Sequence, residues 1–331
     1  MSALGELQRM RKGSGGTLSG GRGGAGRTGA DGTGGRDRKV GDRKDNKAAY
    51  LFLAPWFVGL LVVTAGPIAA SLVLGFTDYN LIQPPVFNGV DNFTRMLADT
   101  RLHKALGVTL TYVLVSVPLQ LACALGLALL LDRGLRGLPF YRSAFYLPSL
   151  LGSSVAIAVL WRQIFGAEGL FNQVLGVFGV EGRGWISDPG TALSTLIVLN
   201  VWTFGAPMVI FLAGLRQIPV MYYEAAATDG ASRWTQFRRI TIPLLSPIVF
   251  FNLVLQIIHA FQSFTQAFVV SGGSGGPSNS TLFYTLYLYQ RGFGNFDMGY
   301  ASALAWLLLV IIAGFTAVNF WAAKFWVVYD D

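Results

Sequence analysis

Six long apolar segments constrain the fold of this 331-residue chain more than any other feature. Each has at least the roughly 20 residues that an α-helix needs to cross the hydrocarbon core of a membrane, and charged side chains are almost absent from their centres. Within lipid the backbone must satisfy its own hydrogen bonds, which favours helices. The sequence therefore predicts an all-α, polytopic membrane protein with six transmembrane helices, near residues 50–75, 105–131, 143–165, 191–215, 245–270 and 300–326.

The first 46 residues differ in composition from the rest of the chain. They are rich in Gly, Arg, Lys, Ser and Asp and contain almost no large apolar side chains. Such a segment buries too little apolar surface to offset the entropy lost when it becomes ordered. We expect residues 1–46 to form a disordered tail and residues 47–331 to form one membrane domain of six helices.

The basic residues indicate the orientation in the membrane. Of the 25 Lys and Arg residues, nineteen lie in the tail, in the loops 132–142 and 216–244 or near the C-terminus, and six lie on the other side. Cytoplasmic loops of membrane proteins carry the excess of Lys and Arg. The count predicts a protein of the cytoplasmic membrane with both termini in the cytoplasm. Without the tail, the excess of Lys and Arg on the cytoplasmic side falls to eight against six. A net charge of +8 distributed in this way favours contact with membrane lipid over nucleic acid.

Cysteine and histidine are too few to suggest a metal centre. Cys123 is the only cysteine and lies inside an apolar segment, while the only histidines, His103 and His259, are far apart in sequence. We therefore expect neither an intrachain disulfide nor a bound metal.

Glu224 to Pro247 forms a charged stretch between two apolar segments. Pro219 suits the first turn of a helix, three alanines follow Glu224, and Gly230 can take the left-handed conformation that ends a helix. Ser232 is a suitable N-cap for a second helix through Arg239. These residues predict a helix, a tight turn and a helix, with an alanine face that fits a groove in another protein. On local grounds alone, an amphipathic elbow at the membrane surface is an equal alternative.

The spacing of this stretch resembles the EAA loop of ABC importer permeases. The matching positions share one register: Glu224, Ala225, Ala226, Asp229, Gly230, Ala231, Phe237, Ile240, Pro243 and Pro247. In that family the loop is the coupling helix, which sits in a cleft of a cytoplasmic ATPase. The resemblance implies a coupling loop at about 216–247, in which the ATPase-coupling residues are Glu224, Ala225, Ala226, Asp229, Gly230 and Pro243. It also implies that ATP is bound by a separate ATPase subunit, so this chain needs no cofactor and is not itself an enzyme.

Further motifs follow in the loops and in the third apolar segment. Composition alone would make the glycine-rich turn 271–277 a flexible connector. The motifs, however, resemble in their order those of the maltose/lactose/glycerol-phosphate class of ABC importer permeases: Phe76-Thr77-Asp78-Tyr79, Gly89 to Phe93, Arg142, Pro148, Trp161 and Gly275-Gly276-Pro277. The resemblance covers about residues 48–326. It implies the type I permease fold, a sugar or sugar-like solute, and a heterodimer with a second homologous permease, two ATPase subunits and an extracytoplasmic solute-binding protein.

The fifth apolar segment carries a stripe of neutral polar residues. Their spacing of four, three, four and three places them on one side of a helix: Asn252, Gln256, His259, Ser263 and Gln266. The positions opposite, which include Phe261 and Phe264, are mostly apolar. Amide and imidazole groups pair with hydroxyl groups without a net charge, so we expect this face to line the solute path, with His259 as the best single candidate. The alternative is that the stripe forms hydrogen bonds to the partner permease.

The rival function is a secondary transporter or channel that works without an ATPase. Such a protein usually has intramembrane Asp, Glu or Lys residues for ion coupling. The second to sixth apolar segments contain none of these in their central parts. A purely structural membrane scaffold, in turn, would not be expected to carry a polar stripe within a span.

Overall fold

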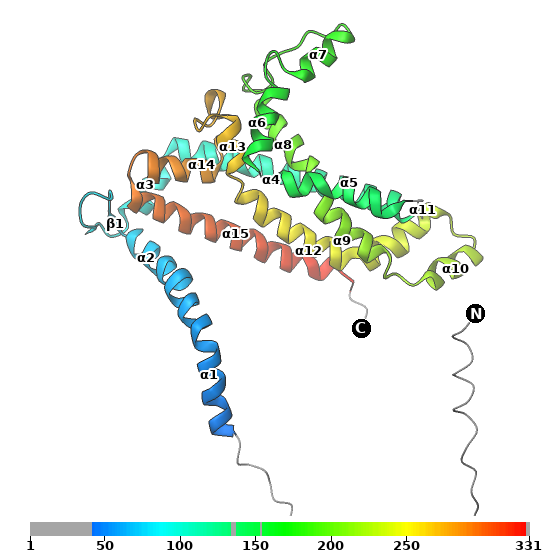
Figure 1. The fold of residues 1–331 in the computed structure, drawn as a ribbon, viewed down its shortest axis with the longest axis horizontal. Helices are drawn as coiled ribbons and strands as arrows, with labels where there is room; N and C mark the ends of the chain where they lie inside the picture. Colours follow the sequence, from blue (N-terminus) through cyan, green and yellow to red (C-terminus); the bar gives the residue numbers. More distant parts are fainter. Residues whose placement is uncertain (1–41, 134–136, 153, 329–331) are drawn as a thin grey trace, which may run out of the picture. The chain divides into compact units, whose positions relative to one another are not determined.

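The computed structural model describes residues 42–133, 137–152 and 154–328, and helices make up most of these ranges (Figure 1). The prediction of an all-α membrane protein is confirmed, with one pair of two-residue strands in the described ranges. In chain order the elements are α1 (Asp42–Gly59), the π-helical η1 (Leu60–Ala65), α2 (Gly66–Leu74), β1 (Thr77–Asp78), β2 (Val86–Phe87), α3 (Asp91–Ala98), α4 (Thr100–Asp132), α5 (Leu138–Leu151), α6 (Val155–Ile164), α7 (Leu170–Val177), α8 (Ala192–Trp202), α9 (Gly205–Leu215), α10 (Val220–Thr228), α11 (Arg233–Gln236), the π-helical η2 (Phe237–Thr241), α12 (Ile242–Phe261), α13 (Thr265–Val270), the 3-10 helix η3 (Pro277–Asn279), α14 (Tyr284–Tyr289), the π-helical η4 (Gln290–Gly294) and α15 (Met298–Trp326).

The chain divides into two compact units, Met1–Val58 and Gly59–Asp331. The described part of the first unit is α1 up to Val58, in which the Leu51 and Phe52 side chains are 75% and 85% exposed. Because α1 begins at Asp42, residues 42–46 of the predicted tail belong to a helix. Residues 1–41 of that tail lie outside the described residues.

Four helical segments are long and apolar enough to cross a membrane: Tyr50–Leu74, Thr100–Asp132, Arg233–Val270 and Met298–Trp326. Two bent pairs raise the number to six if each pair is one span: α5 with α6, bent by 94°, and α8 with α9, bent by 41°. Six spans are thus consistent with the structure. The helices of the third, fourth and fifth segments are each interrupted once, since α12 also ends before α13 begins, although Arg233–Val270 remains one long apolar segment.

Proline explains the break in the fourth segment. Pro207 has no N–H, so the carbonyl of Thr203, four residues earlier, loses its helical hydrogen-bond donor. Side chains from two other helices satisfy that carbonyl instead: Ser149 Oγ donates to it at 2.8 Å and Gln120 Nε2 at 3.2 Å. Membrane helices tolerate a break of this kind where neighbouring side chains re-satisfy the backbone.

Helix α4 forms the centre of the second unit. It packs against α8, α9, α12 and α14, and Leu102, Val113, Val117 and Leu131 are buried along it. Small residues let other helices approach closely, because Ala105, Ala124 and Ala128 have no exposed surface. The core therefore holds α4 rigidly among the three broken helical segments.

The sequence motifs of the first loop tie the end of α2 to the start of α15. The Asn92 side chain donates to the carbonyls of Gly75 and Thr77 at 3.0 and 2.9 Å. A Cβ atom on Gly299 would lie 2.0 Å from the Thr77 oxygen, so this position must remain glycine for the two backbones to meet. The backbone N–H of Gly299 also donates to Tyr79 O at 3.1 Å.

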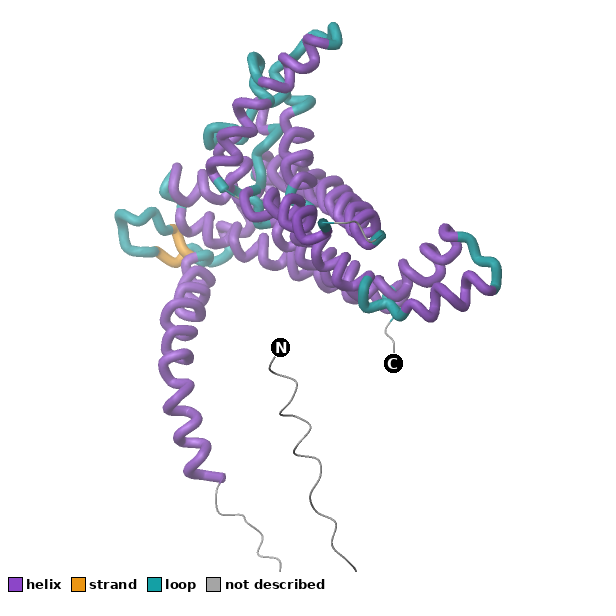
Figure 2. The backbone as a smooth tube through the Cα atoms, turned by 45° about the vertical axis from the view of Figure 1, so that its right-hand side comes forward, coloured by secondary structure: helices purple, strands orange, loops and turns teal. Residues whose placement is uncertain are grey.

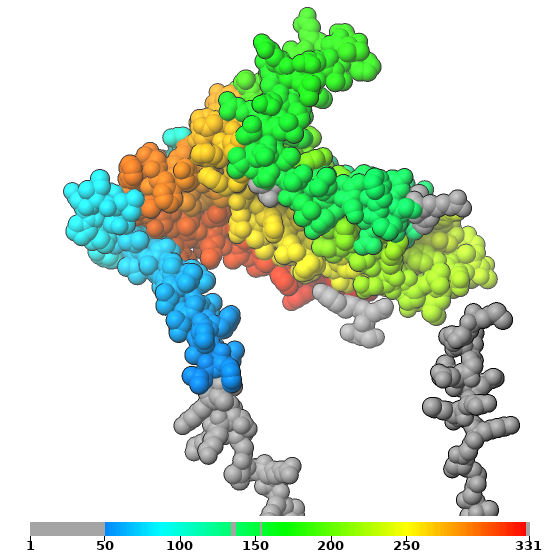
Figure 3. Space-filling view, viewed as in Figure 1, coloured from blue at the N-terminus to red at the C-terminus, as the bar shows by residue number. Residues whose placement is uncertain are grey.

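Residues 165–191 form an excursion that stands clear of the helix bundle, with α7 at its tip (Figures 2 and 3). An aromatic row holds its base, since Phe171 packs against both Phe165 and Trp185 at centroid distances of 5.0 and 5.2 Å. Trp185 Nε1 donates to Asn172 Oδ1 at 2.7 Å. The excursion thus has its own internal contacts, and α10 and α11 lie at one end of the bundle (Figure 1).

Candidate functional site

A polar cavity of about 480 Å³ lies where the three broken helical segments meet α4. Such a convergence places backbone groups and polar side chains around a space at membrane depth, where irregular backbone is tolerated only beside protein or water. The cavity is lined by Tyr112, Gln120, Ser149, Leu199, Asn200, Thr203, Ala206, Pro207, Gln256, His259, Gln262, Ser263, Phe264, Thr265 and Gln266.

Gln120 of α4 braces the break between α8 and α9. Its Nε2 atom donates to Thr203 Oγ1 at 2.9 Å, and its Oε1 atom accepts a hydrogen bond from Asn200 Nδ2 at 3.2 Å. Ser149 of α5 completes the brace, because its hydroxyl also accepts from the backbone N–H of Ala206 at 2.9 Å. One wall of the cavity is thus a closed hydrogen-bond network.

The other two breaks are joined across the cavity. Gln266 Nε2 of α13 donates to the carbonyl of Gly152, next to the break between α5 and α6, at 3.1 Å. Ser263 Oγ donates to Gln266 Oε1 at 3.3 Å. The Ser263 carbonyl, released by the end of α12, accepts a hydrogen bond from the hydroxyl of Thr285 of α14.

Four of the five residues of the predicted polar stripe line this cavity, namely Gln256, His259, Ser263 and Gln266. Asn252 does not: its side chain is fully buried and donates to Ile248 O at 3.0 Å. The helical stripe itself is wrong as geometry, because α12 ends at Phe261 and places the last two residues in a break and in α13.

Phe264 lines the cavity as well, although the helical spacing placed it on the opposite, apolar side. Residues between Phe261 and Thr265 are not helical, so a helical periodicity cannot be extended through the α12–α13 break. Ser263 and Gln266 reach the cavity by this irregular route, whereas Gln256 and His259 reach it from one face of α12.

Sequence reasoning missed further residues of the cavity, most of which come from other helices. They are Tyr112, Gln120, Ser149, Asn200, Thr203, Gln262 and Thr265. A signal was present for two of them, because Gln120 and Asn200 are single amides inside apolar segments. An amide at that depth requires a partner, and here the two amides bond to each other.

The cavity lining is neutral and rich in hydrogen-bonding groups. No Asp, Glu, Lys or Arg is among the described residues that line it, and amides, hydroxyls and one imidazole supply donors and acceptors. Leu199, Pro207 and Phe264 provide apolar surface between them. The lining therefore offers hydrogen bonds without a net charge.

The second candidate site is the surface helix α10. A Schellman motif ends it: Gly230 has φ +77°, its N–H donates to Ala227 O at 3.0 Å, and the Ala231 N–H donates to Ala226 O at 2.9 Å. The prediction that Gly230 ends the helix is confirmed. So is the N-cap Ser232, whose hydroxyl accepts from the Thr235 N–H at 3.3 Å.

The predicted coupling residues lie on or near this exposed helix. Glu224, Ala225, Asp229 and Gly230 are exposed and Ala226 is half-buried, while Pro243 lies in the first turn of α12. The second helix does not stop at Arg239 as predicted, because α11 continues through η2 into α12 without a break. A hydrogen bond of 3.0 Å between Tyr223 and Thr241 ties α10 to this long helix. This bond joins α10 to the continuous helix whose α12 part lines the cavity.

A third polar cluster, at the opposite end of the bundle from α10, is built around Asp99. The Asp99 carboxylate caps α4, accepts hydrogen bonds from the hydroxyls of Tyr287 and Tyr300, and lies 3.4 Å from Arg291 Nη2. Burial alone raises the pKa of the Asp99 carboxyl, but these hydrogen bonds, the Leu102 N–H and the Arg291 charge together lower it below its usual value. Burial and the hydrogen bond to Asp99 raise the pKa of Tyr287 to about 12.

Comparisons with known proteins agree with this architecture. Residues 101–325 match the family "Binding-protein-dependent transport system inner membrane component". The chain is 49% identical to the "Probable ABC transporter permease protein YesP" of Bacillus subtilis (strain 168), over 87% of this chain and 94% of that protein. It is 32% identical to the "Lactose transport system permease protein LacF" of Rhizobium radiobacter, over 83% and 93% of the two chains.

The fold is also found in a solved transporter. A chain of a bacterial ABC transporter involved in the import of the acidic polysaccharide alginate superposes with a TM-score of 0.73 at 21% identity, over 86% of this chain and 97% of that chain. At this identity the likeness concerns the fold alone. With the family match over most of the helical bundle, it identifies the chain as a multi-pass inner-membrane protein that belongs to the family of binding-protein-dependent transport system inner membrane components, the permeases of ABC importers.

Proposed function

We propose that this chain is one of two permease subunits of an importer that carries a sugar or sugar-like solute across the cytoplasmic membrane and is powered by a separate ATPase. The observation that carries the proposal is the uncharged polar cavity at the meeting point of three broken helical segments. Sugars offer many hydroxyl groups and no net charge, which such a lining satisfies. Relatives named for lactose and for trehalose/maltose transport support the solute class.

The cavity supports a heterodimer with a second, homologous permease. His259 and Gln262 line the cavity and are exposed in the single chain, so one side of the chamber lacks a wall. Polar side chains at membrane depth require water, a ligand or another subunit. A second permease that contributes the opposite wall supplies this cover and makes the chamber large enough for an oligosaccharide.

An extracytoplasmic solute-binding protein delivers the solute in this proposal. The bacterial alginate ABC transporter has been solved in complex with its alginate pentasaccharide-bound periplasmic protein, and its permease superposes on this chain with a TM-score of 0.73. In the proposed orientation, with both chain termini in the cytoplasm, the end of the bundle that carries the Asp99 cluster faces such a protein.

Two ATPase subunits drive the cycle, and α10 is the contact with one of them. The exposed alanine face of α10, its Glu224 and the rigid Schellman end suit a helix that fits into a cleft. Pro243 lies where the long helix beyond α11 enters the membrane. ATP binds to the partner subunits and not to this chain, so the chain converts their closure into a movement of α12.

Alternating access follows from these links. Closure of the ATPases moves α10, the Tyr223–Thr241 bond passes the movement to η2 and α12, and α12 carries Gln256 and His259 along one side of the cavity. The breaks at Gly152, Thr203 and Gln262 allow the outer halves of the helices to move separately from the inner halves. The rival secondary transporter would need a charged coupling site, and the described lining of this cavity contains no Asp, Glu, Lys or Arg.

Reconstitution tests the proposal. The full chain, co-produced with candidate partner permease, ATPase and binding protein, is placed in liposomes and supplied with labelled neutral oligosaccharides, uronate oligosaccharides and polyol phosphates. We expect uptake of a neutral oligosaccharide that requires ATP and the binding protein. ATP-independent uptake driven by an ion gradient would contradict the ATPase-driven mechanism.

A further inference from the structure

A groove between α5 and α9 combines one cation, two hydroxyl groups and an apolar floor, and we propose that it binds the headgroup and upper acyl chain of an anionic phospholipid. The groove has a volume of about 490 Å³. Arg142, Ser143 and Tyr146 of α5 form its polar wall, and Ala206, Val209 and Ile210 of α9 form its apolar wall. A phospholipid is divided in the same way, into a polar headgroup and an apolar hydrocarbon chain.

The cation of the groove is available for an external anion. Arg142 is half-buried, and it takes part in none of the four ion pairs found among the described residues. A guanidinium group binds a phosphate with two parallel N–H donors, and the Ser143 and Tyr146 hydroxyls add two further donors to the same wall. An unpaired cation this close to a membrane is costly unless an anion or water reaches it.

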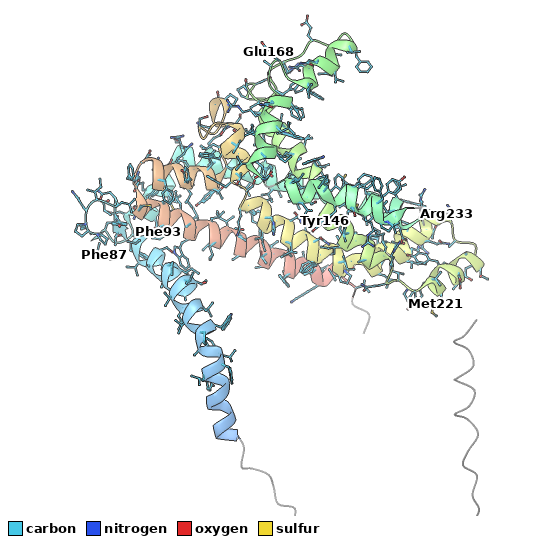
Figure 4. The ribbon with its side chains drawn as sticks, in the orientation of Figure 1. Phe87, Phe93, Tyr146, Glu168, Met221 and Arg233 are labelled. Carbon is cyan, nitrogen blue, oxygen red and sulfur yellow. The ribbon has the colours of Figure 1, made fainter. Side chains whose placement is uncertain are left out.

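The position of the groove along its helices fits the depth of lipid headgroups. It belongs to the first two turns of α5, where Phe140 and Tyr141 are 73% and 41% exposed, and aromatic side chains of this kind gather at membrane–water interfaces. The ion pair between Arg216 and Asp132 marks the same end of the bundle, where α4 and α9 both finish. Figure 4 shows Tyr146 on α5, with Met221 and Arg233 of the surface helices further toward this end.

A lipid fits this groove better than a protein helix does. A helix of the second permease would have to bring an acidic side chain to Arg142 at the edge of an apolar surface, whereas an anionic phospholipid supplies the anion and the apolar chain together. Exposed Leu147, Leu150 and Leu151 extend the apolar surface along α5 beyond the groove.

A bound lipid would also reinforce the cavity wall. Ala206 of α9 borders both the groove and the polar cavity, and α5 contributes Tyr146 to the groove and Ser149 to the cavity. Beside it, a Cβ atom on Gly205 would lie 2.4 Å from Phe145 O, which shows how closely α5 and α9 approach. A lipid in the groove therefore holds these two helices together next to the break at Thr203, whatever solute the cavity carries.

The test uses the full-length chain with the subunits that copurify, in non-ionic detergent. Phosphatidylglycerol, phosphatidylcholine or inorganic phosphate is added, and bound lipid is counted by native mass spectrometry while the thermal midpoint is recorded. We expect phosphatidylglycerol to be retained and to raise the midpoint, and Arg142→Gln to weaken its binding by about tenfold, as the loss of a charge-assisted hydrogen bond implies. The matched control is Arg133→Gln, an exposed arginine at the same end of the bundle that does not line the groove.

A second variant keeps the test decisive if Arg142→Gln disturbs folding. Ile210→Trp fills the apolar wall and leaves Arg142 in place, and we expect the same loss of phosphatidylglycerol with an unchanged far-ultraviolet circular dichroism spectrum. Equal retention by the Arg142→Gln and Arg133→Gln variants would overturn the proposal. So would equal protection by inorganic phosphate, which indicates a free-anion site, or efficient cross-linking of a Ser143→Cys variant to another subunit without bound lipid.

Discussion

The Asp99 cluster and the central cavity are both polar regions in an apolar molecule, and they are built in opposite ways. Around Asp99, opposite charges and hydroxyl groups satisfy one another, and Arg95 adds a second ion pair of 2.9 Å to Asp297 while its guanidinium lies 4.3 Å from the Tyr300 ring centroid. In the cavity, Gln256 and His259 make no side-chain hydrogen bond to another described residue.

This difference separates a structural cluster from a binding site. A buried charge that has all its partners fixes the elements that provide them, here the starts of α4 and α15 and the segment from α14 to η4. Neutral groups without internal partners remain available for a ligand, and their desolvation on binding costs less than that of charges. We therefore expect changes in the first region to affect folding and changes in the second to affect transport.

The largest effect is expected for Asp99→Asn. The substitution leaves Arg291 without its carboxylate and weakens the bonds from both tyrosines, and the loss of hydrogen bonds to a partly buried charge costs about 1.5–3 kcal/mol. Membrane abundance and the thermal midpoint in detergent should both fall. The control Asp188→Asn removes an exposed pair with Arg183 at 3.8 Å and should change stability by about 0.5 kcal/mol or less. Equal losses of stability in the two variants would show that the Asp99 cluster contributes no more to folding than an exposed ion pair does.

Gln256→Leu and His259→Leu should lower uptake and leave assembly intact. Each removes one hydrogen bond to the solute, which corresponds to a loss of affinity of about threefold to tenfold. Basal ATPase activity of the reconstituted complex should stay unchanged, because neither side chain touches α10. A fall in the thermal midpoint similar to that of Asp99→Asn would show that these two side chains stabilise the fold and do not bind the solute.

Gly230→Val should weaken coupling without loss of protein from the membrane. A Cβ atom at this position meets no atom within 4 Å, so the cost comes only from φ +77°, and it amounts to about 1–2 kcal/mol for a β-branched residue. Gly230→Asn is the matched control, because asparagine tolerates the left-handed conformation. Solute-stimulated ATPase activity should fall severalfold in the valine variant and remain near normal in the asparagine variant.

The pH dependence should be small between about pH 5 and pH 9. The Asp99 pKa is lowered in the folded chain, so its contribution to stability is complete above the unfolded pKa and is lost only as the pH falls through the folded value. The Tyr287 pKa is raised to about 12, so its contribution is complete below the unfolded pKa near 10 and is lost as the pH rises toward 12. A midpoint that varies strongly near neutral pH would contradict this account of the cluster.

The fold could be predicted from the sequence because apolar length is a strong signal. The end of α10 and the start of α11 were equally predictable, because Gly230 and Ser232 act through local backbone geometry. The Asp99 cluster was not predictable, because its members come from distant positions along the chain and no local pattern joins Asp99 to Tyr287 or Tyr300.

The cavity could be predicted from the sequence only in part. Four residues picked out by the polar spacing in the fifth apolar segment line the cavity, yet the helix on which the argument depended ends at Phe261. The break has no proline beside it, and hydrogen bonds from Thr285 and Gln266 that stabilise it come from outside α12. Tertiary contacts thus determined a break that local propensity did not reveal.

Cysteine accessibility tests most directly the central claim that the cavity carries the solute. Gln256→Cys, His259→Cys and Ser263→Cys are introduced singly into a Cys123→Ala background and treated with a small water-soluble thiol reagent, with and without ATP and with and without solute. We predict that all three cysteines react in at least one state of the transporter and that the transported solute slows the reaction. Cysteines that stay unreactive in every state would contradict the claim.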